Sequence, residues 1–369
     1  MGETSFQIAV IRGDGIGVDV VDSAIAVLEA LQRKVGGFYL KYNYLLAGAG
    51  YYQQTGKDSE DNDFAQTGAA DAILLGAIGL PWVRYPDGTE VTPHLRIRDQ
   101  FGLYAGVRPI KAYANTPQRL ADPRAANIDL VVLRESTEGL FYSVGRGEVI
   151  DDREARDTLR ITRETTEQLH DFAFRLARKR KERGGKGQVT CVDKANVFRS
   201  MAFFRKIFDE RASLFPDVEK NYNYVDAQAL DLIRKPWEFD VLVMENMFGD
   251  ILSDLGGGLV GGMGMAACAE IGNKHALFQP AHGSAPDIMG QDKANPMAAI
   301  LSTVWMLDWL GEHSRTSAPR LAALLLEKAV EEGFETKRIH PFELGGDQGT
   351  KAVTEEMIQL VRSQSPLCK

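Results

Sequence analysis

The sequence predicts an α/β protein with a parallel sheet, and three observations lead to this expectation. An apolar, β-branched run at residues 6–11 precedes a glycine turn at 12–17, and apolar residues at helical spacing follow over 18–31. This order of strand, turn and helix is typical of the start of a parallel α/β sheet. The chain has 369 residues, which exceeds one ordinary domain, so we expect two domains or one large α/β unit.

The later segments continue the same alternation. Apolar runs predict buried strands at residues 72–78, 128–133, 188–192 and 239–243. Helical patterns predict helices at residues 162–183, 298–310 and 320–332, and Gly184 and Gly185 end the first of them. The glycine-rich stretch 256–264 is the best candidate for a crossing between two lobes.

The composition excludes several classes of function. Hydrophobic residues make up 44% of the chain and charged residues 25%, as in soluble globular proteins. The formal net charge of -8 argues against a nucleic-acid partner, and the basic stretch 178–183 is interpreted as the solvated end of a helix. No apolar run approaches the roughly 18 residues that span a membrane, and residues 1–6 lack the features of a signal peptide. Cys191, Cys268 and Cys368 form neither a metal nor a disulfide pattern, so we expect a cytoplasmic protein.

Two carboxylates suggest a metal site. Asp250 and Asp254 lie four residues apart in an apolar, glycine-rich stretch, and on a helix they share one face. Together with Asp226, they supply the hard oxygen ligands that suit Mg²⁺ or Mn²⁺. Lys194 follows a strand-like run and is a candidate general base. Taken singly, the acids also fit a solvated helix face or a cap, and Lys194 also fits a surface position.

Three arginines suggest a polycarboxylate substrate. Arg98 lies in a predicted helix, Arg108 precedes a proline in an extended segment, and Arg134 follows a buried strand. Guanidinium groups bind carboxylates through two parallel hydrogen bonds, so three of them suit a di- or tricarboxylate. The alternative is that they are surface or ion-paired arginines.

Two loops are candidates for cofactor binding. The turn 13–17 lacks the Gly-x-Gly-x-x-Gly spacing of the Rossmann fold and the lysine of a P-loop, and a tight strand-to-helix turn explains it equally well. The polar, glycine- and proline-rich loop 279–288, followed by residues 291–296, has the composition of a functional loop. His282 in that loop has no partner histidine at metal-ligand spacing.

Read together and in order, these segments resemble the β-decarboxylating dehydrogenases, the isocitrate and isopropylmalate dehydrogenase family. The resemblance covers nearly the whole chain. The motifs that carry it are the glycine turn 13–17, the two-arginine segment 95–109, Arg-Glu-Ser-Thr-Glu-Gly at 134–139, Asp-Lys-Ala-Asn at 193–196, Val-Asp-Ala at 225–227, the acidic run 246–254 and His-Gly-Ser-Ala-Pro-Asp at 282–287.

The resemblance implies an α/β, isopropylmalate dehydrogenase-like two-domain fold that is not a Rossmann fold. Residues 1–105 and 264–369 would form a large nucleotide-binding domain, and residues 106–263 a smaller central domain with a dimer interface. In the implied homodimer each active site is shared: one subunit supplies Lys194 and Asp226, and the other supplies Asp250 and Asp254. Asp226, Asp250 and Asp254 would be the metal ligands.

The implied reaction is the NAD-dependent oxidative decarboxylation of a malate-like 2-hydroxy di- or tricarboxylate, assisted by Mg²⁺ or Mn²⁺. Arg98, Arg108 and Arg134 would hold the substrate carboxylates. Lys194 would take part in removing the proton of the 2-hydroxyl group. The implied cofactor residues are His282, Gly283, Ala285, Asp287, Ile288 and Asn295. Relatives that use NADP usually carry a basic residue where this chain has Asp287, and a carboxylate repels a 2′-phosphate, so we expect NAD.

Two departures from the family pattern bear on the chemistry. A tyrosine usually lies seven residues after the position of Arg134 and helps to protonate the enol, but this chain has Phe141 there, with Tyr142 next to it. Either Tyr142 or a water molecule then protonates the enol, or decarboxylation is slow. Four residues before Arg98, where isopropylmalate enzymes usually carry an apolar residue, stands His94.

His94 favours a polar or small substituent at C3, as in malate, tartrate or isocitrate, unless its side chain merely turns outwards. The substrate therefore stays open among the D-malate/tartrate, isopropylmalate and isocitrate types. Phe141 also leaves open a function of another class, that of a non-catalytic or regulatory subunit of a related dehydrogenase complex.

Overall fold

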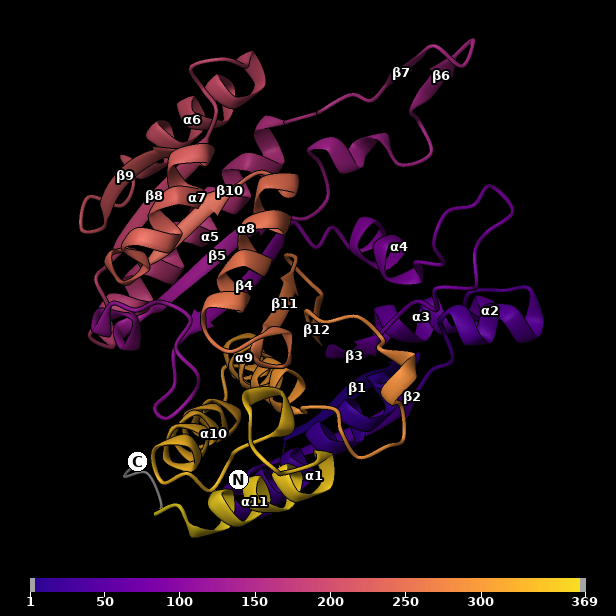
Figure 1. Cartoon of the computed structure of the whole chain (residues 1–369), viewed down its shortest axis with the longest axis vertical. Coiled ribbons are helices and arrows are strands. Elements are labelled where there is room, and N and C mark those ends of the chain that lie inside the picture. Colours follow the sequence, from indigo (N-terminus) through magenta and orange to yellow (C-terminus); the bar gives the residue numbers. More distant parts are fainter. Residues whose placement is uncertain (1–3, 366–369) are drawn as a thin grey trace.

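A computed structural model describes residues 4–365 of the chain, in which one large sheet carries helices on both faces (Figure 1). The sheet has ten strands in the order β2-β1-β3-β12-β11-β4-β5-β10-β8-β9, and β6 and β7 form a separate two-stranded hairpin. The predicted α/β class is confirmed. The strand order, with antiparallel strands at its centre, differs from that of a Rossmann sheet.

The strands have the following bounds: β1 (Thr4–Gly13), β2 (Phe38–Tyr44), β3 (Ala72–Ala77), β4 (Ala105–Lys111), β5 (Asp129–Glu135), β6 (Glu148–Ile150), β7 (Glu154–Arg156), β8 (Gln188–Asp193), β9 (Glu219–Tyr224), β10 (Val241–Met244), β11 (Ala267–Ile271) and β12 (Ala276–Pro280). The α-helices are α1 (Gly17–Val35), α2 (Ala49–Thr55), α3 (Asp61–Ala69), α4 (Pro93–Gln100), α5 (Arg163–Glu182), α6 (Arg199–Ala212), α7 (Val225–Arg234), α8 (Asn246–Leu259), α9 (Met297–Ser314), α10 (Ser317–Glu335) and α11 (Thr350–Ser363).

The sheet consists of two parallel halves that run in opposite directions. β2, β1, β3 and β12 pair in parallel, as do β5, β10, β8 and β9. The antiparallel pairs β12–β11, β11–β4 and β4–β5 join the two halves. Both halves are therefore attached to the same central strands, β11, β4 and β5.

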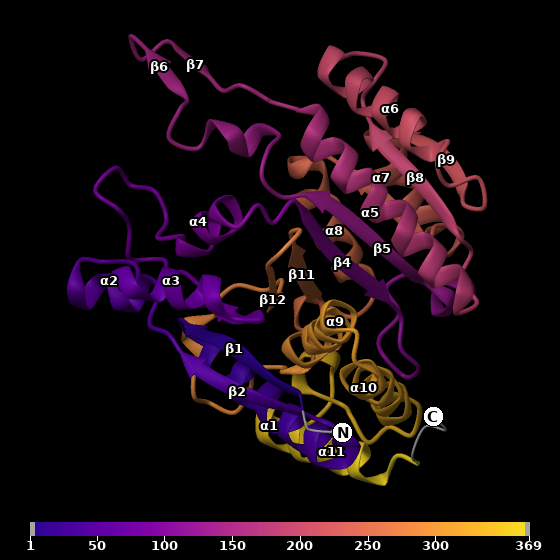
Figure 2. The same cartoon turned by 180° about the vertical axis from the view of Figure 1, so that it is seen from behind.

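Two layers of helices cover the sheet, because side chains alternate between its faces. The larger core cluster joins one face to α1, α5, α6, α9, α10 and α11. On the opposite face, separate apolar clusters involve α3 and α4 over one half and α7 and α8 over the other. Figure 1 shows α8 and α4 on the near side, and Figure 2 shows α5 from behind.

The glycine turn after β1 is packed rather than open. Gly15 has a positive φ of 56°, and a Cβ placed on it would lie 2.0 Å from the backbone oxygen of Ser284. The carboxylate of Asp14 accepts hydrogen bonds from the backbone N–H groups of Ala49, Gly50 and Gly79. The turn thus joins three segments of the chain, which favours the interpretation as a structural turn over the phosphate-binding one.

The predicted strands and helices all occur, with ends that differ by a few residues. The glycine-rich stretch 256–264 is only partly a crossing, because residues 256–259 still belong to α8. Gly256 is required there by close packing, since a Cβ on it would lie 2.1 Å from Ile110 of β4. The division into domains at residues 105 and 264 stays a prediction.

The interpretation of residues 178–183 as the solvated end of a helix is correct for the end of α5 and the exposed residues 181–183, but it is incomplete for the others. Arg180 pairs with Asp129 and with the buried Asp240, while Lys179 and Arg183 reach acids on α9 and α10. Arg178 pairs with Asp217 at an exposed position. Tertiary packing therefore uses this basic stretch to join α5 to its surroundings.

Within residues 4–365, no helix has the length and apolar character needed to cross a membrane. Cys191 and Cys268 are buried and free, and Cys368 lies outside the described residues.

Candidate functional site

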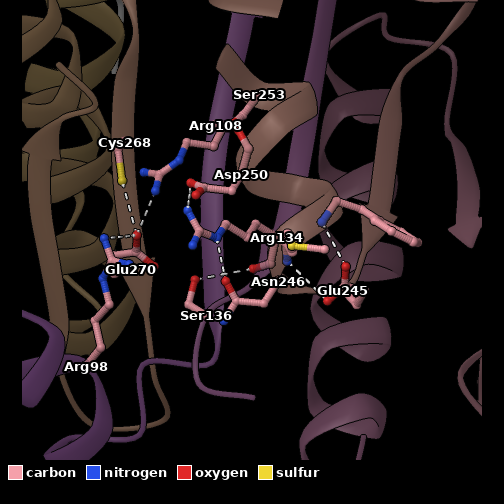
Figure 3. A network of polar contacts seen from close by, with 12 residues as sticks. Arg98, Arg108, Arg134, Ser136, Glu245, Asn246, Asp250, Ser253, Cys268 and Glu270 are labelled. Carbon is pink, nitrogen blue, oxygen red and sulfur yellow. Dashed lines mark hydrogen bonds and ion pairs between the residues drawn. The ribbon is translucent and has the colours of Figure 1, made fainter. Parts of the chain in front are cut away.

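Two arginines from separate elements converge on one buried carboxylate, that of Glu270, and Arg134 lies beside them (Figure 3). Arg98 comes from α4 and Arg108 from β4, and their Nη2 atoms lie 3.0 Å and 2.9 Å from the same oxygen of Glu270, which is on β11. The Glu270 side chain is fully buried. Two guanidinium groups of the predicted substrate site are therefore held together by an acid from the centre of the sheet.

Arg134, at the end of β5, connects this cluster to α8. Its Nε donates a hydrogen bond of 2.8 Å to Asn246 Oδ1, and its Nη1 forms an ion pair with Asp250. The side chain of Glu245 accepts hydrogen bonds from the backbone N–H groups of Met247 and Phe248 and so caps α8. Cap and ion pair together fix the end of α8 that carries the predicted metal ligands (Figure 3).

The charges in the cluster depend on each other. Burial disfavours the Glu270 carboxylate, but the charges of Arg98, Arg108 and Arg134 outweigh burial and lower its pKa. Burial, together with Arg98 and Arg108, lowers the pKa of Arg134 to about 10. At neutral pH the three positive charges of the cluster therefore exceed the two negative charges that pair with them, those of the buried Glu270 and of Asp250.

Several buried polar atoms in this cluster have no hydrogen-bond partner within the described part of the chain. They are Arg98 Nε, Arg108 Nη1, Glu270 Oε2 and His94 Nδ1. Buried donors and acceptors are normally satisfied, so a set of them in one place indicates room for a polar ligand. The cationic excess selects an anionic one, and guanidinium donors fit carboxylates.

His94 belongs to the same cluster. Its Nδ1 is buried, and burial, the charge of Arg98 and then that of Arg134 lower the pKa of His94 to about 3, against an opposing effect of Glu270. The imidazole is therefore neutral at physiological pH. The alternative in which this side chain turns outwards does not fit a buried ring nitrogen beside the arginines.

Phe141 and Tyr142 occupy different surroundings. Phe141 lies beside the cluster, with the guanidinium carbon of Arg134 5.0 Å from its ring centroid. Tyr142 stacks instead with Arg160 and Arg146, at 3.9 Å and 4.5 Å. In this chain the residue that reaches Arg134 is the one without a hydroxyl.

The predicted metal ligands form two separate groups within one chain. Asp250 and Asp254 lie on one face of α8, and burial followed by the charge of Asp250 raises the pKa of Asp254. A position beside a second carboxylate favours a bound cation at Asp254. Asp226, at the start of α7, is largely exposed and pairs with Lys194, which follows β8.

No three acidic, histidine or cysteine side chains of the described residues gather at one point to hold a metal. Lys194 is only partly buried in a single chain, with 26% of its side chain exposed. The buried position considered for a general base is therefore not reached within one chain.

The predicted cofactor residues lie in the loop after β12 and just before α9. Ser284 accepts a hydrogen bond from the backbone N–H of Ile16. Burial lowers the pKa of His282, whose Nε2 has no partner among the described residues. Gly283 and Asp287 are exposed, whereas Ala285 and Ile288 pack against the core.

Asn295 is the exception in this group, because its side chain is already used within the protein. Its amide donates to Glu343, and its oxygen accepts from the backbone N–H of Met297.

Sequence reasoning missed Glu270 and Asn246. The signal for Glu270 was a single carboxylate inside the apolar run Ala267–Ile271, which predicts a buried acid that needs a cationic partner.

We expect Glu270→Gln to lower the free energy of unfolding by about 3–5 kcal/mol, because it leaves Arg98 and Arg108 buried without a counter-charge. The measurement is urea unfolding. Asp217→Asn is the control, since the exposed pair of Asp217 with Arg178 contributes at most about 1 kcal/mol. Equal effects of the two substitutions would contradict the central role of Glu270.

Comparisons with known proteins agree with this geometry. The family model described as isocitrate/isopropylmalate dehydrogenase matches residues 7–361. The chain is 40% identical to the 3-isopropylmalate/3-methylmalate dehydrogenase of Methanocaldococcus jannaschii, over 97% of this chain and 99% of that protein. It is 37% identical to the 3-isopropylmalate dehydrogenase of Aquifex aeolicus, over 96% of each.

Solved structures give the same result. An isocitrate dehydrogenase from Methylococcus capsulatus superposes with a TM-score of 0.82 at 34% identity, covering 97% of this chain and 100% of that one. A β-decarboxylating dehydrogenase from Thermococcus kodakarensis in its apo form gives 0.78 at 35% identity, with 96% of each chain covered. By sequence and by fold, the chain belongs to the isocitrate/isopropylmalate dehydrogenase family of β-decarboxylating dehydrogenases.

Proposed function

We propose that the protein catalyses the NAD-dependent oxidative decarboxylation of a malate-like 2-hydroxy acid with the help of Mg²⁺ or Mn²⁺. The observation that carries this proposal is the cluster of Arg98, Arg108 and Arg134, with unpartnered buried atoms, directly beside Asp250. Such a cluster suits a substrate with at least two carboxylates, and the neighbouring acids suit a divalent cation.

The proposed active site is shared between two subunits of a homodimer. Asp226 and Lys194 pair with each other in one chain and lie apart from Asp250 and Asp254. Exposed apolar side chains on α7 and α8, Leu230, Ile233 and Ile251, support a subunit contact on this face. In the proposed dimer, Asp226 of the partner subunit joins Asp250 and Asp254 as metal ligands.

In the proposed reaction, this chain's residues bind and orient the substrate and move protons. Arg98, Arg108 and Arg134 hold its carboxylates, and Lys194 of the partner subunit accepts the proton of the 2-hydroxyl group. The divalent cation, held by Asp250, Asp254 and Asp226 of the partner subunit, would supply Lewis-acid polarisation of the oxygen at C2, and NAD would supply the hydride acceptor. After the carboxylate on C3 leaves as CO₂, that carbon takes up a proton. Phe141 has no hydroxyl to supply it, so either water or a re-aimed Tyr142 supplies the proton, or decarboxylation is slow.

The residues around the cofactor loop support NAD. Asp287 is exposed in this loop, and its carboxylate would repel a 2′-phosphate and accept hydrogen bonds from the ribose hydroxyls of NAD. His282, Gly283, Ala285 and Ile288 are the further cofactor residues of this proposal. Asn295 would contribute indirectly, because its side chain is hydrogen-bonded to Glu343 and to the backbone N–H of Met297 at the start of α9.

The neutral His94, whose Nδ1 is buried, supports a small or polar substituent at C3 of the substrate. A neutral imidazole donates one hydrogen bond and accepts another, and an isopropyl group satisfies neither. A non-catalytic subunit is the second candidate function, and the observation that favours it is Phe141 beside Arg134.

We expect the purified protein to form NADH from D-malate, a tartrate isomer or isocitrate in the presence of Mn²⁺. This reaction should stop when EDTA removes the metal. NADP should give a kcat/KM about tenfold lower than NAD, because of the charge of Asp287. The absorbance of the reduced cofactor measures the turnover of each of these acids, and also of homoisocitrate and of 3-isopropylmalate. No turnover of any acid would favour the non-catalytic subunit, and a preference for NADP would refute the cofactor assignment.

We expect His94→Leu to raise the ratio of kcat/KM for 3-isopropylmalate to that for D-malate by about tenfold, because it replaces a polar contact by an apolar one. His313→Leu is the control, since His313 stacks on Trp309 near the end of α9. A ratio that stays unchanged in His94→Leu would remove His94 from the C3 subsite.

We expect Asp226→Asn and Asp250→Asn to be inactive alone but to regain about a quarter of wild-type activity when the two chains are co-expressed. Half of the dimers are then mixed, and each mixed dimer has one intact shared site. Activity of the co-purified chains is the measurement. The pair Asp250→Asn and Asp254→Asn should not recover, because one subunit supplies both residues. Lack of recovery in the first pair would contradict a shared site.

A further inference from the structure

The arginine cluster and a second feature lie on opposite faces of the same central strands. Along β4, Arg108 and Ile110 face α8, where Ile110 belongs to the same apolar cluster as Leu252. The alternate residues Pro109 and Lys111 face the other way. There they line a cavity of about 270 Å³ whose walls are α5 on one side and α9 and α10 on the other. Figure 2 shows these three helices from behind.

The two walls of this cavity carry opposite charges over an apolar floor. The floor includes Met265, Ala267, Leu301 and Val304. The lining cations Lys111, Lys179, Arg180 and Arg183 belong to β4, α5 and the turn after α5, with Asp129 of β5 beside them, whereas the lining acids Asp308, Glu327 and Glu331 belong to α9 and α10.

Ion pairs span the cavity from one half of the sheet to the other. Lys179 Nζ lies 2.5 Å from Asp308 Oδ2 and also pairs with Glu312. Lys111 Nζ lies 2.5 Å from Glu331 Oε1. The side chains of Lys179 and Asp308 are only 25% and 16% exposed, so salt screens their pair less than a surface pair.

Across this cavity α5 meets α9 and α10 through ion pairs, although apolar residues of all three helices belong to the same core cluster. A packed core resists relative movement because its side chains interdigitate. A cavity bridged by long, flexible lysine side chains leaves room for the two walls to move apart or together.

We propose that these ion pairs form a latch that favours the conformation in which the arginine-cluster face is open. The two halves share the strands β11, β4 and β5, so bending about these strands brings α4 and α8 together on one face and separates α5 from α9 and α10 on the other. Closure around a ligand at the arginine cluster thus stretches the ion pairs of Lys179 and Lys111. This inference goes beyond the proposed function and does not depend on it.

The test compares two neighbouring cations on α5. Lys179→Met removes the latch pairs with Asp308 and Glu312, whereas Arg178→Met removes a pair with Asp217, which lies in the turn after α6 and does not cross the cavity. Spin labels on Gln54→Cys in α2 and Val144→Cys report the opening, because Val144 lies across a groove from α2 and α4. The background carries Cys368→Ser, since Cys191 and Cys268 are buried. Pulsed electron resonance measures the distance between the labels.

We expect the distance to shorten in Lys179→Met, and to shorten in the wild type when salt is raised from about 20 to about 500 mM, since salt screens the pairs. Salt should have a smaller effect on Lys179→Met, in which the pair of Lys111 with Glu331 remains, and Arg178→Met should behave as the wild type. The ratio of closed to open populations should rise about two- to fivefold, as for one partly buried ion pair. Identical distances in wild type and Lys179→Met, or equal shifts in the two variants, would overturn the proposal.

Lys111→Met removes the pair with Glu331 and gives an independent test of the latch. Its distance decides for or against the latch if Lys179→Met does not fold. Because the distance is measured without substrate, it stays informative even if the proposed dehydrogenase activity is absent. If that activity is present, Lys179→Met should lower the KM for the hydroxy acid about two- to fivefold, and Arg178→Met should leave it unchanged.

Discussion

The ion pairs of Glu270 with Arg98 and Arg108 are the interaction on which the candidate site depends. Three guanidinium groups within one buried region repel each other, and burial adds a cost for each of them. A fully buried carboxylate between them offsets both costs. The same arrangement leaves other hydrogen-bonding atoms unpartnered, so the cluster is stable as a fold element and still able to bind an anion.

The position of Glu270 follows from the way the sheet is joined. β11 and β4 are antiparallel neighbours between two parallel halves, so Glu270 and Arg108 meet at the centre of the molecule. Arg134 on β5 adds the contact to α8 and its carboxylates. The site therefore lies where the two halves meet, and any bending of the central strands changes its shape. The ion pairs of α5 with α9 on the opposite face act on the same bending.

Much of this could be read from local patterns. The strand and helix periods are local, and the spacing of Asp250 and Asp254 alone places both on one helical face. The interpretation of the basic stretch on α5 was incomplete, because its charges were judged by their neighbours in sequence, whereas their partners lie on β5, α9 and α10. The role of Glu270 was missed for the same reason, since its partners are more than 100 residues away in the chain.

The sequence by itself determined the fold class, the elements and the family to which the chain belongs, because each depends on residue order and spacing along the chain. Tertiary structure alone decided which groups meet: Glu270 with Arg98 and Arg108, Phe141 rather than Tyr142 beside Arg134, and a neutral His94 with a buried Nδ1 near the arginines. It also separated Asp226 and Lys194 from Asp250 within one chain. Burial and charge compensation arise only when distant segments come together, so no local pattern contains them.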